Sequence, residues 1–267
     1  EKDDMRRVRL LVNHCEKFLT HSSLLTDASS GIIQGKLGIM YSYLGNNLKA
    51  KDILTKSYDN LARYLPENHE NIAEVLVYLG EAHADIGDHE KPETFLEQSL
   101  LIYRKYCPDK PLKIASTLVS LGRVYRLIGL YEEAKDRLEE ALSIYRKHVA
   151  EDYAKLVWAL VQLGDIYRNL NDYQKAENLL EEAMAICKQK IPKNYIKLSA
   201  VSLHLGKLYR DIGRYDKAVE LFEKSLAISD EYLPTNSMIN ASLVGNLGIL
   251  YRELGTYEKG KEFFEKA

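Results

Sequence analysis

A fourteen-residue segment recurs along this 267-residue chain and constrains its fold more than any other feature. It reads LGRVYRLIGLYEEA at residues 121–134 and returns as LGDIYRNLNDYQKA at 163, LGKLYRDIGRYDKA at 205 and LGILYRELGTYEKG at 247. The glycine after its first leucine recurs every 42 residues, without insertion, at Gly38, Gly80, Gly122, Gly164, Gly206 and Gly248. A fixed period of this length is typical of repeat architectures, so we predict an array of six equivalent repeats.

Each repeat is predicted to form two helices joined by a short turn. In the third repeat, apolar residues at spacings of three and four share one face of a first helix. They are Ile114, Leu118, Leu121, Val124 and Tyr125. Gly129 ends this helix, and Asn171 takes the same place in the fourth repeat; both residue types adopt the left-handed conformation that follows a helix end. The second helix follows directly.

The motif glycine lies inside the first helix, where glycine is unfavourable. It costs about 1 kcal/mol relative to alanine at such a position. Because the chain keeps it in every repeat, we expect it to mark a point where two helices approach too closely for a side chain.

The spacing of the motif resembles that of the tetratricopeptide repeat (TPR). The matching residues in the third repeat are Gly122, Tyr125, Ala134, Leu138 and Ala141. The usual TPR period is about 34 residues, and the 42-residue period, with its LY-R and GxYxxA elements, resembles the longer repeats of kinesin light chain and nephrocystin-like proteins. The resemblance covers residues 26–267 and implies an all-α TPR solenoid, a right-handed superhelix of antiparallel helix pairs.

The register also predicts the domain organisation. Residues 26–267 form six tandem repeats in a single solenoid domain, with the last repeat truncated, whereas residues 1–25 form the second helix of a preceding repeat and its connector. We therefore expect the sequence to be a section of a longer array. In the second repeat, Pro92 stands where Ala134 and Ala176 stand in later repeats. Because proline lacks an N–H and clashes with the preceding turn, this helix should start late or bend near residue 91.

Composition argues against several classes of function. The formal net charge is −2, so no overall basic field points to nucleic acid. No apolar run approaches the roughly 20 residues that a membrane span requires. Cys15, Cys107 and Cys187 are far apart and form neither a disulfide framework nor a zinc motif, which indicates a reducing compartment and predicts a cytoplasmic location.

No motif in the sequence supports catalysis. The segment GIIQGKLG at residues 31–38 has the wrong spacing for a phosphate-binding loop and lies within a predicted helix. His83 and His89 stand where other repeats have tyrosine, so we interpret them as structural substitutions and not as a metal pair. Serine, histidine and aspartate occur without a nucleophile elbow. We predict that the chain is not an enzyme and binds no cofactor or metal.

The resemblance implies a concave groove lined by the first helices, at positions −6, −3, −2, +1, +4 and +5 from the motif glycine. Position +4 is arginine in four repeats: Arg126, Arg168, Arg210 and Arg252. We name these residues the arginine ladder. Arginine suits a carboxylate-bearing partner because its planar fork forms paired, charge-assisted hydrogen bonds. The alternative is that each arginine pairs with a neighbouring repeat, for example Arg168 with Asp165 or Asp211, and only stabilises stacking.

Further predicted peptide-binding positions are aromatic or polar. Trp158, the only tryptophan, shares one helix face with Gln162, Asp165 and Asn169. Tryptophan is enriched in interface hot spots; alternatively, Trp158 packs between neighbouring first helices. The remaining predicted positions are Arg123, His204, Lys207 and Asn246. The second repeat is acidic at the same surface, with Glu74, Glu81 and Asp85.

These features predict a protein–protein interaction module, a scaffold or adaptor whose groove binds a peptide or helical segment. If the arginine ladder contacts that segment, its partner should be acidic. A competing interpretation is the sensor or autoinhibitory arm of a larger signalling protein with a nucleotide-switch domain. Nucleic acid and membrane are not expected as partners, and the sequence leaves the oligomeric state open.

Overall fold

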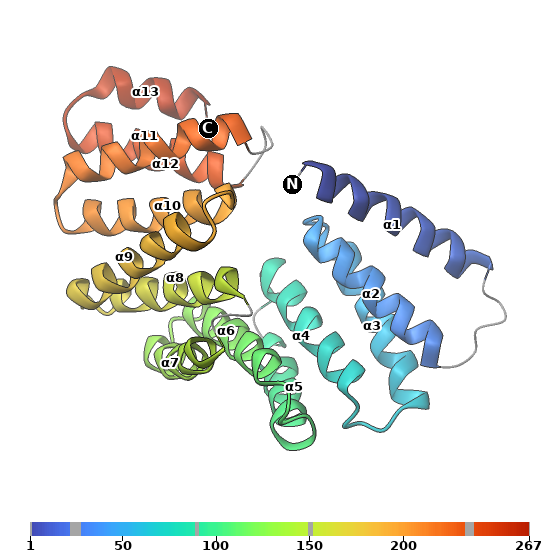
Figure 1. Ribbon diagram of the computed structural model, residues 1–267. Helices are drawn as coiled ribbons and strands as arrows, with labels where there is room; N and C mark the ends of the chain where they lie inside the picture. The colour runs from blue at the N-terminus through green and yellow to red at the C-terminus, as the bar shows by residue number, and fades with distance from the viewer. Residues whose placement is uncertain (1, 22–27, 89–90, 149–151, 233–237, 267) are drawn as a thin grey trace. The chain divides into compact units, whose positions relative to one another are not determined.

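The computed structural model describes residues 2–21, 28–88, 91–148, 152–232 and 238–266. Thirteen α-helices make up the regular structure of these residues (Figure 1). They are α1 (Lys2–His21), α2 (Ala28–Tyr43), α3 (Asn47–Tyr64), α4 (Glu70–Asp85), α5 (Pro92–Tyr106), α6 (Pro111–Leu127), α7 (Tyr131–Lys147), α8 (Tyr153–Asn169), α9 (Tyr173–Lys190), α10 (Tyr195–Asp211), α11 (Tyr215–Tyr232), α12 (Met238–Glu253) and α13 (Tyr257–Lys266).

The helices pack as the repeat predicts. In five of the repeats the first helix contacts the second helix of its own repeat: α2 contacts α3, α4 contacts α5, α8 contacts α9, α10 contacts α11 and α12 contacts α13. Successive first helices also touch one another, α8 with α10 and α10 with α12. The predicted all-α class of stacked helix pairs is therefore confirmed. Among the described helices, none combines the length and the apolar character needed to cross a membrane.

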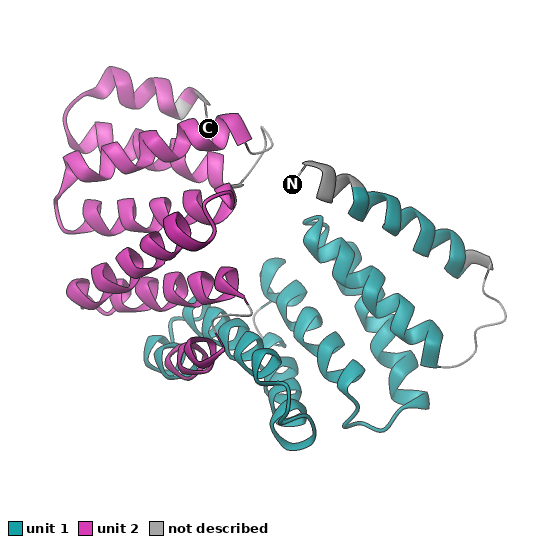
Figure 2. Ribbon diagram, viewed as in Figure 1, with its two compact units in different colours: residues 1–137 teal, residues 138–267 magenta. Residues whose placement is uncertain are grey.

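The chain divides into two compact units, residues 1–137 and residues 138–267 (Figure 2). Unit 1 holds α1 to α6 and the first part of α7, and unit 2 holds the rest of α7 and α8 to α13. The helix predicted within residues 1–25 is present as α1. Residues 22–25 of the predicted connector lie outside the described residues, and the single solenoid domain stays a prediction.

The motif glycines lie where helices approach closely. A Cβ atom on Gly206 would stand 2.3 Å from Cε1 of Phe222, and one on Gly38 would stand 2.5 Å from Cγ of Leu54. The first helix therefore packs on the second at a distance that a side chain would not permit, as predicted. At the turn between them, Asn171 has a φ of 61°, so the predicted left-handed helix end is confirmed in the repeat that lacks glycine there.

The start of α5 confirms the effect predicted for Pro92. This helix begins at Pro92 itself, and Lys91 before it provides no side-chain cap. By contrast, α9 begins at Tyr173, three residues before Ala176, its equivalent of the proline. Because proline is favourable only in the first turn of a helix, α5 loses one turn at its N-terminus.

Candidate functional site

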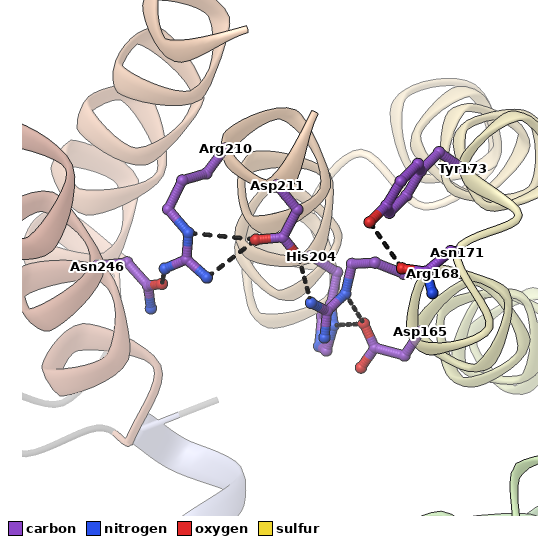
Figure 3. Close-up of polar contacts among 8 residues, drawn as sticks. All are labelled: Asp165, Arg168, Asn171, Tyr173, His204, Arg210, Asp211 and Asn246. Carbon is purple, nitrogen blue, oxygen red and sulfur yellow. Dashed lines mark hydrogen bonds and ion pairs between the residues drawn. The ribbon is translucent and has the colours of Figure 1, made fainter. Parts of the chain in front are cut away.

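A row of polar side chains links the first helices of unit 2. These side chains project from α8, α10 and α12, which contact one another in that order. Figure 3 shows that hydrogen bonds and ion pairs join the row across all three helices. Its members are Asp165, Arg168, His204, Arg210, Asp211 and Asn246, and we name them the polar row.

Asp165 on α8 is the most buried charge of the polar row, with 4% of its surface exposed. Nδ1 of His204 on α10 donates a hydrogen bond of 2.8 Å to Oδ1 of this carboxylate. Nε of Arg168, one turn along α8, lies 3.6 Å from the same oxygen. A buried carboxylate requires such compensation, because desolvation of an unpaired charge is costly.

Asp211 at the end of α10 continues the row. Its Oδ2 atom accepts a hydrogen bond of 2.6 Å from Nη1 of Arg168. Its Oδ1 atom accepts from Nη2 and Nε of Arg210, at 3.1 Å and 3.3 Å. Nη1 of Arg210 donates to Oδ1 of Asn246 on α12 at 2.9 Å, and Asn246 in turn donates to the carbonyl of Ser242 at 2.7 Å.

The arginine ladder is therefore paired within the protein at two of its positions. Burial opposes the charge of Arg168, but Asp165 and Asp211 outweigh it and raise the pKa of the guanidinium. The side chains of Arg168 and Arg210 are only 19% and 21% exposed. For these two residues, the structure shows the contacts of the stacking interpretation, including both partners that it named for Arg168.

The other two ladder arginines have different surroundings. Arg126 lies in unit 1, and its Nε atom has no hydrogen-bond partner among the described residues. Arg252 on α12 is exposed and borders a shallow cavity of about 340 Å³ together with Tyr257 and Lys261. Four residues in one repeat position thus differ in exposure and pairing, so the ladder does not act as one uniform surface.

Trp158 lies half-buried on α8 and contacts the next first helix. Nζ of Lys197 on α10 stands 4.7 Å from the centroid of its ring. Gln162, one turn further along α8, is only 2% exposed, and its Oε1 atom has no hydrogen-bond partner among the described residues. Sequence reasoning selected both α8 residues but missed Lys197, which resembles an ordinary surface lysine in a first helical turn.

The remaining predicted positions are distributed over both units. Asn169 and Lys207 are half-buried in unit 2. In unit 1, Nη1 of Arg123 donates to Oδ1 of Asp85 at 2.5 Å. Of the predicted residues, the structure joins Asp165, Arg168, His204, Arg210 and Asn246 by direct contacts. Asp211, which the sequence suggested only as a pairing partner, is the member that connects two of the arginines.

Unit 1 has its own polar contacts at the equivalent positions. Oγ of Ser120 donates to Oε1 of Glu81 at 2.5 Å, and Lys113 forms an ion pair with Glu74. Burial raises the pKa of the Glu81 carboxyl group, although Ser120 and Arg123 oppose that shift. The acidic positions of the second repeat are therefore paired with residues of the third.

Stacked helix pairs, glycine-mediated contacts and touching first helices define an α-solenoid of helix–turn–helix repeats. The chain belongs to the tetratricopeptide repeat family, whose model matches residues 29–105, 113–189 and 197–267. This family is a repeat scaffold, and the match indicates no catalytic family. Among the described residues, no group of three histidine, cysteine, aspartate or glutamate side chains could hold a metal ion.

Solved structures have the same fold. The TPR-like repeats of a kinesin light chain candidate from Podosopora anserina are 23% identical and cover 74% of this chain and 93% of that one, with a TM-score of 0.61. BtubC (BKLC) from P. vanneervenii is 19% identical over 87% of this chain and 93% of its own, with a TM-score of 0.64. The Rap protein complexed with Competence and Sporulation Factor is 16% identical over 98% of this chain and 75% of its own, with a TM-score of 0.72. No curated protein matches the sequence.

Proposed function

We propose that this chain is a protein–protein interaction module, a scaffold or adaptor that binds a peptide or helical segment of a partner. The binding surface is the polar row on α8, α10 and α12. One observation carries this proposal: a continuous set of contacts fixes the side chains from Asp165 to Asn246 across three successive helices. Side chains held in this way lose little further conformational entropy when a ligand binds.

The polar row favours recognition of a peptide backbone. Arg210 uses three of its five N–H groups in its contacts with Asp211 and Asn246, so two donors remain for carbonyl oxygens of a ligand. Its positive charge is already balanced by Asp211, and that of Arg168 by Asp165 and Asp211. A backbone carbonyl carries no net charge, so the remaining donors can bind it without requiring a further anionic partner.

The Rap structure supports this proposal because a TPR fold similar to this one is seen there in complex with Competence and Sporulation Factor. No observation on the described residues favours the competing sensor-arm function, which stays a prediction from the sequence. The cytoplasmic location likewise stays a prediction.

A quantitative pull-down tests the proposal with two matched variants. Arg210→Ala removes the donors of the polar row. Arg214→Ala removes another ion-paired arginine, which lies in the turn between α10 and α11 and pairs with Glu177 at 2.7 Å, outside the row. Partners captured by the wild type should be lost with Arg210→Ala and kept with Arg214→Ala. Equal retention by both variants, with melting curves that confirm folding, would refute the proposed surface.

A further inference from the structure

Two pairs of residues occupy the same repeat positions in the two units but differ in chemistry. In unit 1, Glu74 on α4 forms an ion pair with Lys113 on α6, 39 residues later. In unit 2, the equivalent residues are Trp158 on α8 and Lys197 on α10. Tryptophan therefore replaces the carboxylate, and the lysine contacts its ring instead. The ion pair in unit 1 therefore shows which contact the tryptophan replaces at the equivalent position of unit 2.

Lys197 has a cation–π contact but no ion pair among the described residues. Burial lowers the pKa of its ammonium group, and the nearby Cys187 and Asp152 only partly oppose this shift. The carboxylate of Asp152 is already engaged, since it lies 3.2 Å from Nζ of Lys155 and accepts from the Lys155 backbone N–H at 3.1 Å. A partly buried ammonium group is stabilised by an opposite charge, and none of the described carboxylates forms an ion pair with this one.

Gln162, on the same face of α8, has a second polar group without a partner among the described residues. It follows Trp158 by four residues, so the two side chains lie one turn apart. Its buried Oε1 atom accepts no hydrogen bond from the described residues. The terminal torsion of a glutamine is broad, so a small rotation can turn this acceptor toward a neighbouring donor. A peptide N–H group is such a donor.

We propose that Trp158, Lys197 and Gln162 form a binding site for a single carboxylate group of a peptide partner. Nζ of Lys197 donates to the carboxylate, the indole ring covers the aliphatic part of the ligand, and Gln162 accepts from an adjacent backbone N–H. The site has one lysine and no arginine, so its single positive charge balances one carboxylate group. This inference rests on the proposed function and assigns the acidic contact to Lys197, because the charges of Arg168 and Arg210 are balanced within the protein.

The single tryptophan provides a direct readout. Its indole N–H gives one resonance, which can be followed during titration with small probes in the millimolar range. N-acetylglutamate amide carries a side-chain carboxylate, N-acetylglutamine carries a C-terminal carboxylate, and N-acetylglutamine amide is the neutral control. We expect at least one carboxylate probe to shift the resonance saturably while the neutral probe does not. The two charged probes distinguish a side chain from a chain terminus as the source.

Variants at the equivalent lysines complete the test. Lys197→Met should weaken the carboxylate probe at least tenfold, Lys197→Arg should retain most of the affinity, and Lys113→Met should leave it unchanged. If the charged and neutral probes behave alike, if no probe shifts the resonance, or if Lys197→Met binds like the wild type, the inference is wrong. Its failure is distinguishable from failure of the proposed function, because the pull-down with Arg210→Ala involves neither Trp158 nor Lys197.

Discussion

The hydroxyl group of Tyr251 on α12 donates a hydrogen bond of 2.6 Å to Glu223 on α11. The same link, from a tyrosine to the glutamate 28 residues earlier, recurs in four repeats: Tyr125 to Glu97, Tyr167 to Glu139, Tyr209 to Glu181 and Tyr251 to Glu223. In these four repeats the motif tyrosine thus connects the first helix to the preceding second helix. In the second repeat, His83 stands in its place and pairs with Asp88 instead.

Removing one of these hydroxyl groups should weaken the stacking of repeats. We expect Tyr209→Phe to lower the free energy of unfolding by about 1 kcal/mol, the usual contribution of a hydrogen bond. Urea denaturation measures this change. Tyr173→Phe is the control, because its hydroxyl donates to Asn171 on the exposed surface. An equal loss in both variants would show that the interhelical link has no special contribution.

The same tyrosine predicts a pH dependence. Burial raises the pKa of Tyr209 to about 12, with further contributions from Glu177 and Glu181. Its pKa in the unfolded chain is about 10, so the folded state holds the proton more tightly. This stabilisation is complete below about pH 10 and is lost as the pH rises toward the folded pKa. Tyr209→Phe should therefore lose less stability than the wild type over that range, as measured by urea denaturation at each pH.

The close approach at Gly206 should be intolerant of any side chain. Gly206→Ala places Cβ against Phe222 and should cost about 1–3 kcal/mol through overpacking. Gly245→Ala is the matched control, because a Cβ atom there would meet no heavy atom within 4 Å, and alanine should stabilise the helix by about 1 kcal/mol. Thermal melting separates the two. The double variant Gly206→Ala, Phe222→Leu should recover part of the loss, and no recovery would contradict this account.

The fold is predictable from the sequence because the same helix, turn and glycine positions recur in six repeats at a strict period. The close approach at Gly206, the left-handed Asn171 and the late start at Pro92 all follow from backbone sterics, which depend on local residue type. The candidate site is less predictable, because pairing depends on which helix each side chain reaches. Arg168 could pair with Asp165 or Asp211, and the structure shows that it contacts both.

Two features could have been found by comparing repeat positions. The glutamates that accept from the motif tyrosines recur every 42 residues, at Glu97, Glu139, Glu181 and Glu223. The exchange of Glu74 for Trp158 opposite an equivalent lysine is equally visible in the aligned repeats. What the sequence does not contain is the distance between the two helices, which decides whether such residues touch. Lys197 therefore became a candidate only from the structure.

The polar row should contribute to folding as well as to recognition. Arg168→Glu sets a carboxylate beside Asp165 and Asp211 and should lower the free energy of unfolding by about 3 kcal/mol, as expected when a buried ion pair is broken. Arg252→Glu changes the same repeat position at an exposed site and should stay within about 0.5 kcal/mol of the wild type. Chemical denaturation compares the two variants. Similar losses would mean that pairing with Asp165 and Asp211 does not set the stability of this surface.

The ammonium group of Lys197, which has no ion pair among the described residues, should lower the free energy of unfolding by an amount that depends on pH. Burial lowers its pKa in the folded state, below the value of about 10.4 expected in the unfolded chain. Between these two values the unfolded chain binds more protons, so the stability of the wild type rises with pH in that window. Lys197→Met removes the titrating group, and we expect this variant to be at least as stable as the wild type at neutral pH, with the difference shrinking as the pH approaches about 10.4.

Denaturation with urea at about pH 7 and about pH 10 measures this effect. Lys113→Met is the control, because the equivalent lysine has the ion pair with Glu74 that Lys197 lacks. Breaking that pair should lower stability by no more than about 1 kcal/mol at neutral pH, since both side chains are partly exposed. At neutral pH, the change in the free energy of unfolding should therefore differ in sign between Lys197→Met and Lys113→Met. If Lys197→Met is the more destabilising of the two, the ring of Trp158 already stabilises the ammonium group fully, and no carboxylate is required to complete its surroundings.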